Sequence, residues 1–438
     1  MTLLHESVVL GEPAEVFAWH ERVGALPRLL PPWQPVRVIE EARSLRDGRA
    51  VLRLPGGVRW VAQHSGYEPP LRFVDDLVSL PLRWHHVHTF EADSPTSTRV
   101  IDTVDTAIPS RLVARTFRYR HRQLADDLVT QREMARRGSG AMTVAVTGSS
   151  GLVGSALCAL LTTGGHRVIR LVRRAPERAD ERQWRPGEPD PEMLVGTDAV
   201  VHLAGASIAG RFGQAHKRRI EDSRVAPTAR LAEAMARATN GPKTLVAASA
   251  IGFYGAERGN ERLDETTGPG QGFLAEVVER WESAARPALT AGIRVVHLRT
   301  GIVQSPRGGV LRLLRPLFEA GLGGPVGGGH QWLSWIDLDD LTDAYYLALV
   351  DPGLSGPVNA VAPHPVTNAE FATTLARVLR RPSLVAVPAL GLRLILGQDG
   401  ARELALASQW VSALRLTAAG FAFRRPTLEA CLRHQLGA

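Results

Sequence analysis

The chain has 438 residues and a formal net charge of +8, with 44% hydrophobic and 22% charged residues. This length allows two or three domains, each with its own core. Almost all of the positive charge is arginine, because Lys217 and Lys243 are the only lysines. No basic run carries interleaved aromatic residues, so the composition argues against nucleic-acid binding.

The sequence carries no pattern typical of export or of a membrane span. The first residues lack a basic head followed by an apolar stretch, and no window of about 18 residues is uninterruptedly apolar. The two cysteines, Cys158 and Cys431, have no partner at metal-binding spacing, and no disulfide framework is implied. We therefore expect a cytoplasmic protein without a membrane span.

Residues 1–138 have the pattern of an antiparallel sheet followed by a long helix. Turn signals such as Asp47-Gly48 separate short alternating runs, which is typical of a β-meander. The last segment, 109–136, has apolar residues at helical spacing. The expected strands are 5–10, 36–40, 49–54, 58–64, 71–77, 83–90 and 98–106, with a short helix over 13–20.

This order of elements is similar to that of the START/polyketide-cyclase-like superfamily. The opening stretch from Ser7 to Trp19 also loosely matches the pattern S-x-x-L-x-x-P-A-x-x-V-F-x-W. The resemblance implies a helix-grip fold, in which a curved sheet wraps the long helix and leaves a cavity for a hydrophobic ligand. We expect a domain of this kind over residues 1–138.

Three histidines, His85, His86 and His88, lie on the expected strand 83–90. Side chains alternate along a strand, so only His86 and His88 share a face. No acidic or cysteine partner for them is identifiable in the sequence. They are therefore interpreted as lining or flanking the sheet, and no metal site is predicted.

The strongest motif follows the apolar strand that ends at Thr147. Three glycines come at GxxGxxG spacing, and a helical pattern begins after them. The first glycine permits the tight turn, the second lets a pyrophosphate approach the backbone, and the third lets the helix pack closely. A strand before and a helix after the glycines indicate a dinucleotide site. The predicted cofactor contacts are Gly148, Ser149, Ser150, Gly151, Leu152, Val153 and Gly154.

The residues after the next strand bear on the choice of cofactor. An NAD site usually has an acidic residue there for the ribose hydroxyl, whereas this chain has Arg173 and Arg174. A guanidinium suits a 2′-phosphate, so NADP is predicted. The alternative is that both arginines are simply solvated.

Further strands are expected in 198–205, 244–255 and 294–303. Strands that alternate with helical segments imply a doubly wound parallel sheet. The first of these ends in small residues, which are needed where a strand end approaches the cofactor. Leu203, Ala204 and Gly205 are therefore added to the predicted site.

Several segments together carry a family pattern, namely residues 147–154, 198–205, 223–225, 251–255, 299–303, 321–327, 409–411 and 420–423. They resemble the epimerase-family proteins, an atypical branch of the extended short-chain dehydrogenases/reductases. The resemblance covers about 142–435. It implies an NADP-binding Rossmann domain over 142–380, a small C-terminal domain over 381–438, and a place for Arg224 and Val303 near the cofactor.

Short-chain dehydrogenases use a Ser or Thr, a Tyr, and a Lys four residues further on, whose charge lowers the pKa of the tyrosine. Ser249 fits the first role. Phe273 and Val277 stand where the tyrosine and lysine belong, and neither can transfer a proton. No Tyr-x-x-x-Lys occurs anywhere in the chain.

Three interpretations therefore stay open. In the first, Tyr254 is the acid, assisted by Ser249, in an oxidoreductase or epimerase acting on an unidentified small molecule. In the second, the protein is an NADP-dependent sensor or ligand-binding protein without turnover, and Tyr254 is a core residue. In the third, Glu276 is the acid/base for a substrate that is not an alcohol.

The segment after residue 330 offers two weaker signals. Asp337, Asp339 and Asp340 precede a helical pattern, where acidic residues cap a helix and oppose its dipole, so capping is preferred to metal binding. Trp332 and Trp335 fit the wall of a substrate pocket and a packed core equally well.

Overall fold

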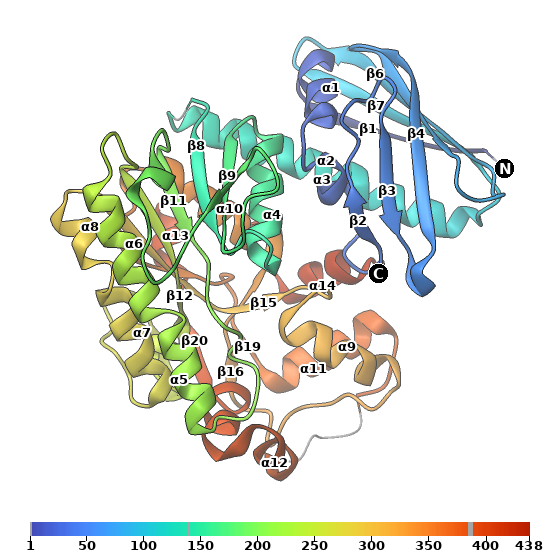
Figure 1. Ribbon diagram of the computed structural model, residues 1–438. Helices are drawn as coiled ribbons and strands as arrows, with labels where there is room; N and C mark the ends of the chain where they lie inside the picture. The colour runs from blue at the N-terminus through green and yellow to red at the C-terminus, as the bar shows by residue number, and fades with distance from the viewer. Residues whose placement is uncertain (1, 139, 384–388) are drawn as a thin grey trace. The chain divides into compact units, whose positions relative to one another are not determined.

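The computed structural model describes residues 2–138, 140–383 and 389–438 (Figure 1). The chain divides into two compact units, and the first consists mainly of the residues up to Gly138, together with Cys158–His166 and Gly437. None of the helices in these described ranges is long and apolar enough to cross a membrane. The predicted C-terminal domain includes residues 384–388, which lie outside the described residues.

The first unit is built on one antiparallel sheet, with seven strands in the order β1-β7-β6-β5-β4-β3-β2. Helix α3 follows the last strand and packs against β1. The predicted antiparallel sheet and long final helix are confirmed. The elements are β1 (Thr2–Leu10), α1 (Pro13–Glu21), α2 (Ala25–Leu29), β2 (Arg37–Glu40), β3 (Arg49–Arg53), η1 (Pro55–Gly57), β4 (Arg59–Glu68), β5 (Arg72–Leu77), β6 (Trp84–Ser94), β7 (Ser97–Thr106) and α3 (Ser110–Arg136).

Side chains alternate between the two faces of this sheet. Strand β7 alternates half-buried and buried residues along its whole length. The buried face of β6 carries His86, His88 and Phe90. Leu124 and Leu128 of α3 join the apolar core around Phe90. The inner face of the sheet is thus apolar around Phe90 and polar around His86 and His88.

The second unit contains a sheet in the order β10-β9-β8-β11-β12-β14-β18, and every neighbouring pair in it is parallel. The predicted doubly wound α/β fold is confirmed. The sheet strands are β8 (Thr143–Thr147), β9 (Arg167–Val172), β10 (Glu181–Gln183), β11 (Ala199–His202), β12 (Thr244–Ala250), β14 (Arg294–Thr300) and β18 (Gly356–Ala360).

The strand order reverses at β8, which lies between β9 and β11 (Figure 1). In open parallel sheets, ligands bind beyond the carboxyl ends of the strands at such a reversal. Helices α6 and α8 pack with the sheet in one apolar cluster, while α10 also packs on β12 and β14. The helices are α4 (Leu152–Thr163), α5 (Gln214–Asp222), α6 (Val225–Arg237), α7 (Phe273–Ser283), α8 (Arg286–Thr290), α9 (Gly309–Glu319), α10 (Leu338–Val350), α11 (Asn368–Leu379), α12 (Ala389–Gly400), α13 (Leu414–Ala418) and α14 (Leu428–Leu436).

Three two-stranded sheets complete this unit. Strands β13 and β20 pair in parallel, as do β15 and β17, and β16 and β19 pair antiparallel. They bring the last part of the chain against the segments that follow β12 and β14. The remaining elements are β13 (Glu257–Leu263), β15 (Ile302–Gln304), β16 (Trp332–Leu333), β17 (Trp335–Asp337), β19 (Val366–Thr367), β20 (Ser408–Val411), η2 (Pro191–Leu194), η3 (Ile251–Tyr254) and η4 (Ala401–Ala405).

Candidate functional site

The glycine loop connects β8 to α4 in a turn that excludes side chains. Gly148 has φ +65°, and a Cβ atom there would lie 2.8 Å from the carbonyl carbon of Leu203. A Cβ atom on Gly154 would overlap the carbonyl oxygen of Gly148. The first glycine therefore lets the loop pass the neighbouring strand end, and the third lets α4 pack against the loop, as the spacing predicted.

Buried polar contacts fix the ends of β8 and β11 together. The Thr147 hydroxyl oxygen accepts hydrogen bonds from the backbone N–H groups of Leu203 and Ala204, at 3.1 and 3.3 Å. The same oxygen lies 2.8 Å from Nδ1 of His202. Burial lowers the pKa of His202 to about 4, so the ring is neutral near pH 7. The predicted contacts Leu203 and Ala204 thus lie beside the glycine loop, and Gly205 follows them next to Arg224.

The two arginines after β9 have different surroundings. Arg174 donates two hydrogen bonds to the Glu181 carboxylate, at 2.7 and 2.9 Å. Arg173 is exposed, and no hydrogen bond or ion pair of its side chain occurs within the described residues. The structure therefore leaves the Arg173 guanidinium available to a ligand and holds the Arg174 guanidinium with an internal partner.

Arg224 makes internal hydrogen bonds, and Val303 is half-buried in a strand. The Arg224 guanidinium donates to the carbonyl oxygens of Ala206 and Ile220, at 2.9 and 3.1 Å. It also lies 5.2 Å from the ring of Trp281. Arg224 therefore positions the segment that follows the predicted contact Gly205. Val303 is half-buried in β15, and the proximity of both residues to a cofactor stays a prediction.

Ser249 lies near the carboxyl end of β12 and belongs to a charged network. Its hydroxyl donates to Oε1 of Glu282 at 2.6 Å. Arg299 donates to both carboxylate oxygens of Glu282, each at 2.8 Å. Burial alone would raise the pKa of Glu282, but the hydrogen bonds and charge of Arg299 lower it. Glu282 lies on helix α7 and was not singled out by sequence, because its partners come from the strands β12 and β14.

Tyr254 is fully buried at the end of the short helix η3. Its hydroxyl donates to Oδ1 of Asn359 at 2.8 Å and accepts from Arg299 at 3.2 Å. Burial raises the pKa of the Tyr254 phenol, against the opposing effect of Arg299. These contacts favour the interpretation of Tyr254 as a packed residue, because a proton donor must reach its substrate.

Helix α7 begins at Phe273, where the family tyrosine is expected. The Nζ atom of Lys217, from α5, lies 5.2 Å from the Phe273 ring and 2.6 Å from Oδ2 of Asp399. Val277, at the lysine position, is buried with apolar neighbours. Glu276 is exposed on the same helix. The described part of the chain thus places one lysine near this helix end, but from a different element.

Of the three acidic residues at the start of α10, Asp337 acts as predicted, whereas Asp339 and Asp340 lie within the helix. Asp337 caps the helix, and its side chain accepts from the backbone N–H of Asp339 at 2.8 Å. Asp340 accepts from the backbone N–H of Arg424 at 2.6 Å. The helix-capping interpretation is therefore confirmed for Asp337. Of the two tryptophans, Trp335 is buried in the core, and Trp332 stacks on Trp410 with ring centroids 4.8 Å apart.

The first unit contains a cavity of about 550 Å³. Most of its wall is apolar, but His20, His64, Asp75 and His88 also line it. As the strand alternation predicted, His86 and His88 face inward and are buried, while His85 faces solvent. The residues that line the apolar part include Leu26, Leu29, Trp33, Leu52, Trp60 and Phe73.

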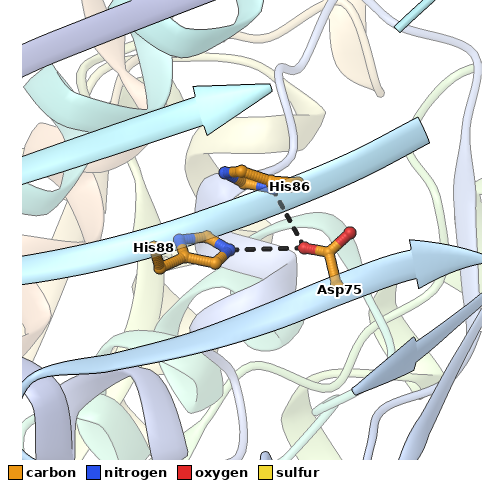
Figure 2. A group of neighbouring side chains, drawn as sticks. All are labelled: Asp75, His86 and His88. Carbon is orange, nitrogen blue, oxygen red and sulfur yellow. Dashed lines mark hydrogen bonds and ion pairs between the residues drawn. The ribbon is translucent and has the colours of Figure 1, made fainter. Parts of the chain in front are cut away.

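Acidic partners of the two inward histidines come from neighbouring strands. Asp75 of β5 lies opposite His86 of β6, and Asp102 of β7 lies opposite His88. Figure 2 shows the Asp75 carboxylate pointing toward both imidazole rings. Sequence spacing does not encode strand register, so these carboxylates were missed. The alternation of β7, which puts Asp102 on the buried face, was the available signal.

The glycine loop, the strand reversal and the parallel sheet define a Rossmann-type α/β protein of the short-chain dehydrogenase kind. The sequence model of the NAD dependent epimerase/dehydratase family matches residues 144–360. A domain of unknown function matches residues 387–435. An epimerase family protein of Mycobacterium bovis is 46% identical over 288 residues, which is 65% of this chain and 94% of that protein. The chain therefore belongs to the NAD-dependent epimerase/dehydratase family.

Two solved structures extend the comparison. A crystal structure of a nucleoside-diphosphate sugar epimerase from Corynebacterium glutamicum is 42% identical with a TM-score of 0.87, and the match covers 99% of this chain and 90% of that one. The likeness therefore includes the first unit. The human epimerase family protein SDR39U1, whose crystal structure was obtained with NADPH, is 32% identical with a TM-score of 0.62, over 67% of this chain and 99% of that one.

Proposed function

We propose that the second unit binds NADP(H) at the carboxyl ends of β8, β9 and β11. The observation that carries the proposal is the exposed Arg173 guanidinium, which has no internal partner within the described residues. A 2′-phosphate placed after β9 would meet this cation, and arginine rather than an acidic residue stands directly after the strand, where a free ribose hydroxyl would be selected. The human relative with NADPH supports the same choice.

The glycine loop would hold the pyrophosphate of this cofactor. Its backbone N–H groups and the first turn of α4 favour an anion there. Residues 148–154 and Leu203 to Gly205 would surround the cofactor, and Arg224 would keep the last of these segments in place through its bond to Ala206. Val303 would lie on the same side of the sheet.

Titration of the full chain with NADPH and NADH, followed by cofactor fluorescence, tests this proposal. The expected result is tight NADPH binding with much weaker NADH binding. Equal affinities would reject the NADP assignment while leaving the dinucleotide site intact. Failure to bind either cofactor would reject the site itself.

We propose that the protein is an epimerase-like or oxidoreductase-like enzyme that acts on an unidentified small molecule, with Ser249 and Tyr254 near the reacting group. Catalysis would proceed without the usual Tyr-x-x-x-Lys pair, with Tyr254 as the acid. Glu276 is the alternative acid/base, for a substrate that is not an alcohol. Turnover with panels of alcohols, ketones and sugar nucleotides in the presence of NADPH or NADP⁺ is the direct measurement.

A second candidate function is an NADP-dependent ligand-binding or sensor protein without turnover. The full burial of Tyr254 and its bond to Asn359 favour this candidate. Tight NADPH binding without turnover across those panels is its expected signature. Hydride transfer to any substrate of the panels would reject it.

For the first unit we propose a helix-grip domain of the START/polyketide-cyclase-like kind over residues 1–138, followed by a Rossmann domain over 142–380 and a C-terminal domain over 381–438. The antiparallel sheet, the long helix α3 and the cavity of about 550 Å³ support a hydrophobic ligand. Native mass spectrometry of the purified chain, followed by identification of any released molecule, tests whether the cavity carries one.

A further inference from the structure

Three potential metal-ligating atoms converge beside the cavity of the first unit. Nδ1 of His86 lies 3.0 Å from Oδ2 of Asp75, and Nε2 of His88 lies 3.3 Å from the same oxygen. All three atoms lie within 4.8 Å of one another (Figure 2). Two histidines and one carboxylate on adjacent strands therefore point at a common place.

The opposite edges of both imidazole rings are held by a second carboxylate. Oδ1 of Asp102 lies 2.9 Å from Nε2 of His86 and 2.8 Å from Nδ1 of His88. A carboxylate accepts hydrogen bonds, so the His86 ring donates its Nε2–H to Asp102. In a neutral His86 ring, Nδ1 then carries a lone pair.

This tautomer leaves one acceptor facing another. The lone pair of His86 Nδ1 is directed toward Oδ2 of Asp75, with which a neutral ring cannot form a hydrogen bond through that nitrogen. Nε2 of His88 is hydrogen-bonded to the same oxygen at 3.3 Å. Nδ1 of His86 is buried and makes no hydrogen bond of acceptable geometry within the described residues. A cation between the three atoms would satisfy all of them.

The two imidazole rings lie close enough to share one ion. Their centroids are 3.8 Å apart, and both side chains are buried.

Further hydrogen bonds hold the two carboxylates in this orientation. The indole N–H of Trp84 donates to Oδ1 of Asp75 at 3.0 Å, which leaves Oδ2 toward the histidines. The other oxygen of Asp102 lies 2.8 Å from Nε2 of His121, and Nδ1 of His121 lies 2.7 Å from the Ser7 hydroxyl. Partners of this kind orient the ligands of metal sites.

We propose that Asp75, His86 and His88 bind a divalent transition-metal ion, with zinc the best fit. Zinc takes imidazole and carboxylate ligands at about 2.0–2.2 Å in a tetrahedral arrangement, which separates ligand atoms by roughly 3.3 Å. The two separations of 3.0 and 3.3 Å from the Asp75 oxygen agree with this spacing.

The fourth coordination position would belong to the cavity. Asp75 and His88 line it, together with His64 of the neighbouring strand. Three protein ligands and one open position are typical of zinc sites that bind a water or a ligand atom. The class of ligand that fits is a small apolar molecule with a hydroxyl, carbonyl or carboxylate oxygen at one end.

The test measures metal binding by the full chain after removal of any affinity tag. Metal-depleted protein is titrated with Zn²⁺, and with Co²⁺ as a spectroscopic probe, and the bound metal is counted by elemental analysis. The expected result is one ion per chain, with a visible Co²⁺ absorption that Zn²⁺ abolishes. Absence of bound metal in the folded wild-type chain would overturn the proposal.

Variants locate the ion. Asp75→Asn and His88→Ala should lose it, whereas His85→Ala should retain it, because His85 lies on the same strand but faces solvent and bonds Asp76. Asp102→Asn, which leaves the ligands in place, should bind about 10- to 100-fold more weakly. Retention of the ion by Asp75→Asn and His88→Ala, with unchanged affinity, would also overturn the proposal.

Two controls separate loss of metal from loss of fold. Circular dichroism reports on each variant, and NADPH titration reports on the second unit, so a failure of the proposed cofactor site is seen independently. If a variant does not fold, X-ray absorption of the wild-type Zn²⁺ form decides. It should show imidazole nitrogen and oxygen ligands, and a thiolate ligand would exclude this site.

Discussion

Glu181 binds Arg174 through both carboxylate oxygens, at 2.7 and 2.9 Å, while the neighbouring Arg173 stays exposed. The pair crosses from the end of β9 to β10, the next strand of the sheet. The Glu181 carboxylate has its pKa lowered by the Arg174 hydrogen bonds. One arginine thus links the end of β9 to β10, and the other is exposed directly after β9, the strand that pairs with β8.

Arg173→Ala should weaken NADPH binding and spare NADH binding. Loss of a charge-assisted hydrogen bond costs about 1.5–3 kcal/mol, or roughly 10- to 100-fold in the dissociation constant. The matched control is Arg174→Ala, whose side chain already has an internal partner and whose effect should be smaller. Equal loss of NADPH and NADH affinity in Arg173→Ala would reject the 2′-phosphate assignment.

Tyr254→Phe distinguishes a packed residue from a catalytic one. The variant leaves the Oδ1 atom of Asn359 without its donor, and burial of an unsatisfied group costs about 1–3 kcal/mol. We expect this loss in the free energy of unfolding measured by urea titration, with unchanged NADPH affinity. If an activity is found, its persistence in Tyr254→Phe would remove Tyr254 as the acid. Its loss without a change in stability would contradict the packing interpretation.

The strand runs, the glycine spacing and the two arginines could be predicted because each depends on residues close in sequence. Helix α3 and strand β6 were predicted within a few residues of their bounds for the same reason. It could not be predicted that Arg174 binds an internal carboxylate while Arg173 stays exposed, because this difference depends on where Glu181 lies after the turn into β10.

The two buried polar clusters could also not be predicted in full from the sequence. His86 and His88 were placed on one face correctly, yet Asp75 and Asp102 meet them only through strand register. Glu282 meets Ser249 and Arg299 because α7 returns beside β12 and β14. Contacts that join distant parts of the chain follow from tertiary packing, which local patterns do not specify.

His202 predicts a pH dependence of stability. Burial lowers its pKa in the folded protein to about 4, whereas an unfolded histidine titrates near pH 6.5. Below pH 6.5 the unfolded state therefore binds more protons, and stability falls as the pH falls toward 4. Above pH 6.5 both states are neutral at this site, and it contributes no pH dependence.

His202→Asn isolates this contribution from the other histidines. Between pH 6.5 and 5 the wild type should lose roughly 1.4–2 kcal/mol more of its unfolding free energy than the variant. Chemical denaturation at several pH values measures the difference. Parallel pH profiles for the two proteins would show that His202 is not held neutral. The variant should also be less stable at pH 7, because Thr147 and Thr228 lose the ring that joins them.

Val277→Lys restores a lysine at the family position, and the structure predicts that it destabilises the fold. Val277 is buried with Phe212 and Ile220, so the ammonium group would lose its hydration without a counter-ion. A buried lysine has its pKa lowered by up to 3–5 units, which corresponds to about 4–7 kcal/mol of folding free energy. Glu276→Lys, one residue away and exposed, is the matched control; it lies in the first turn of α7, where a positive charge is unfavourable, and should change stability by about 1 kcal/mol or less. If Val277→Lys is as stable as the control, the helix end is open enough to accept a lysine, and the apolar packing at this position does not explain its absence.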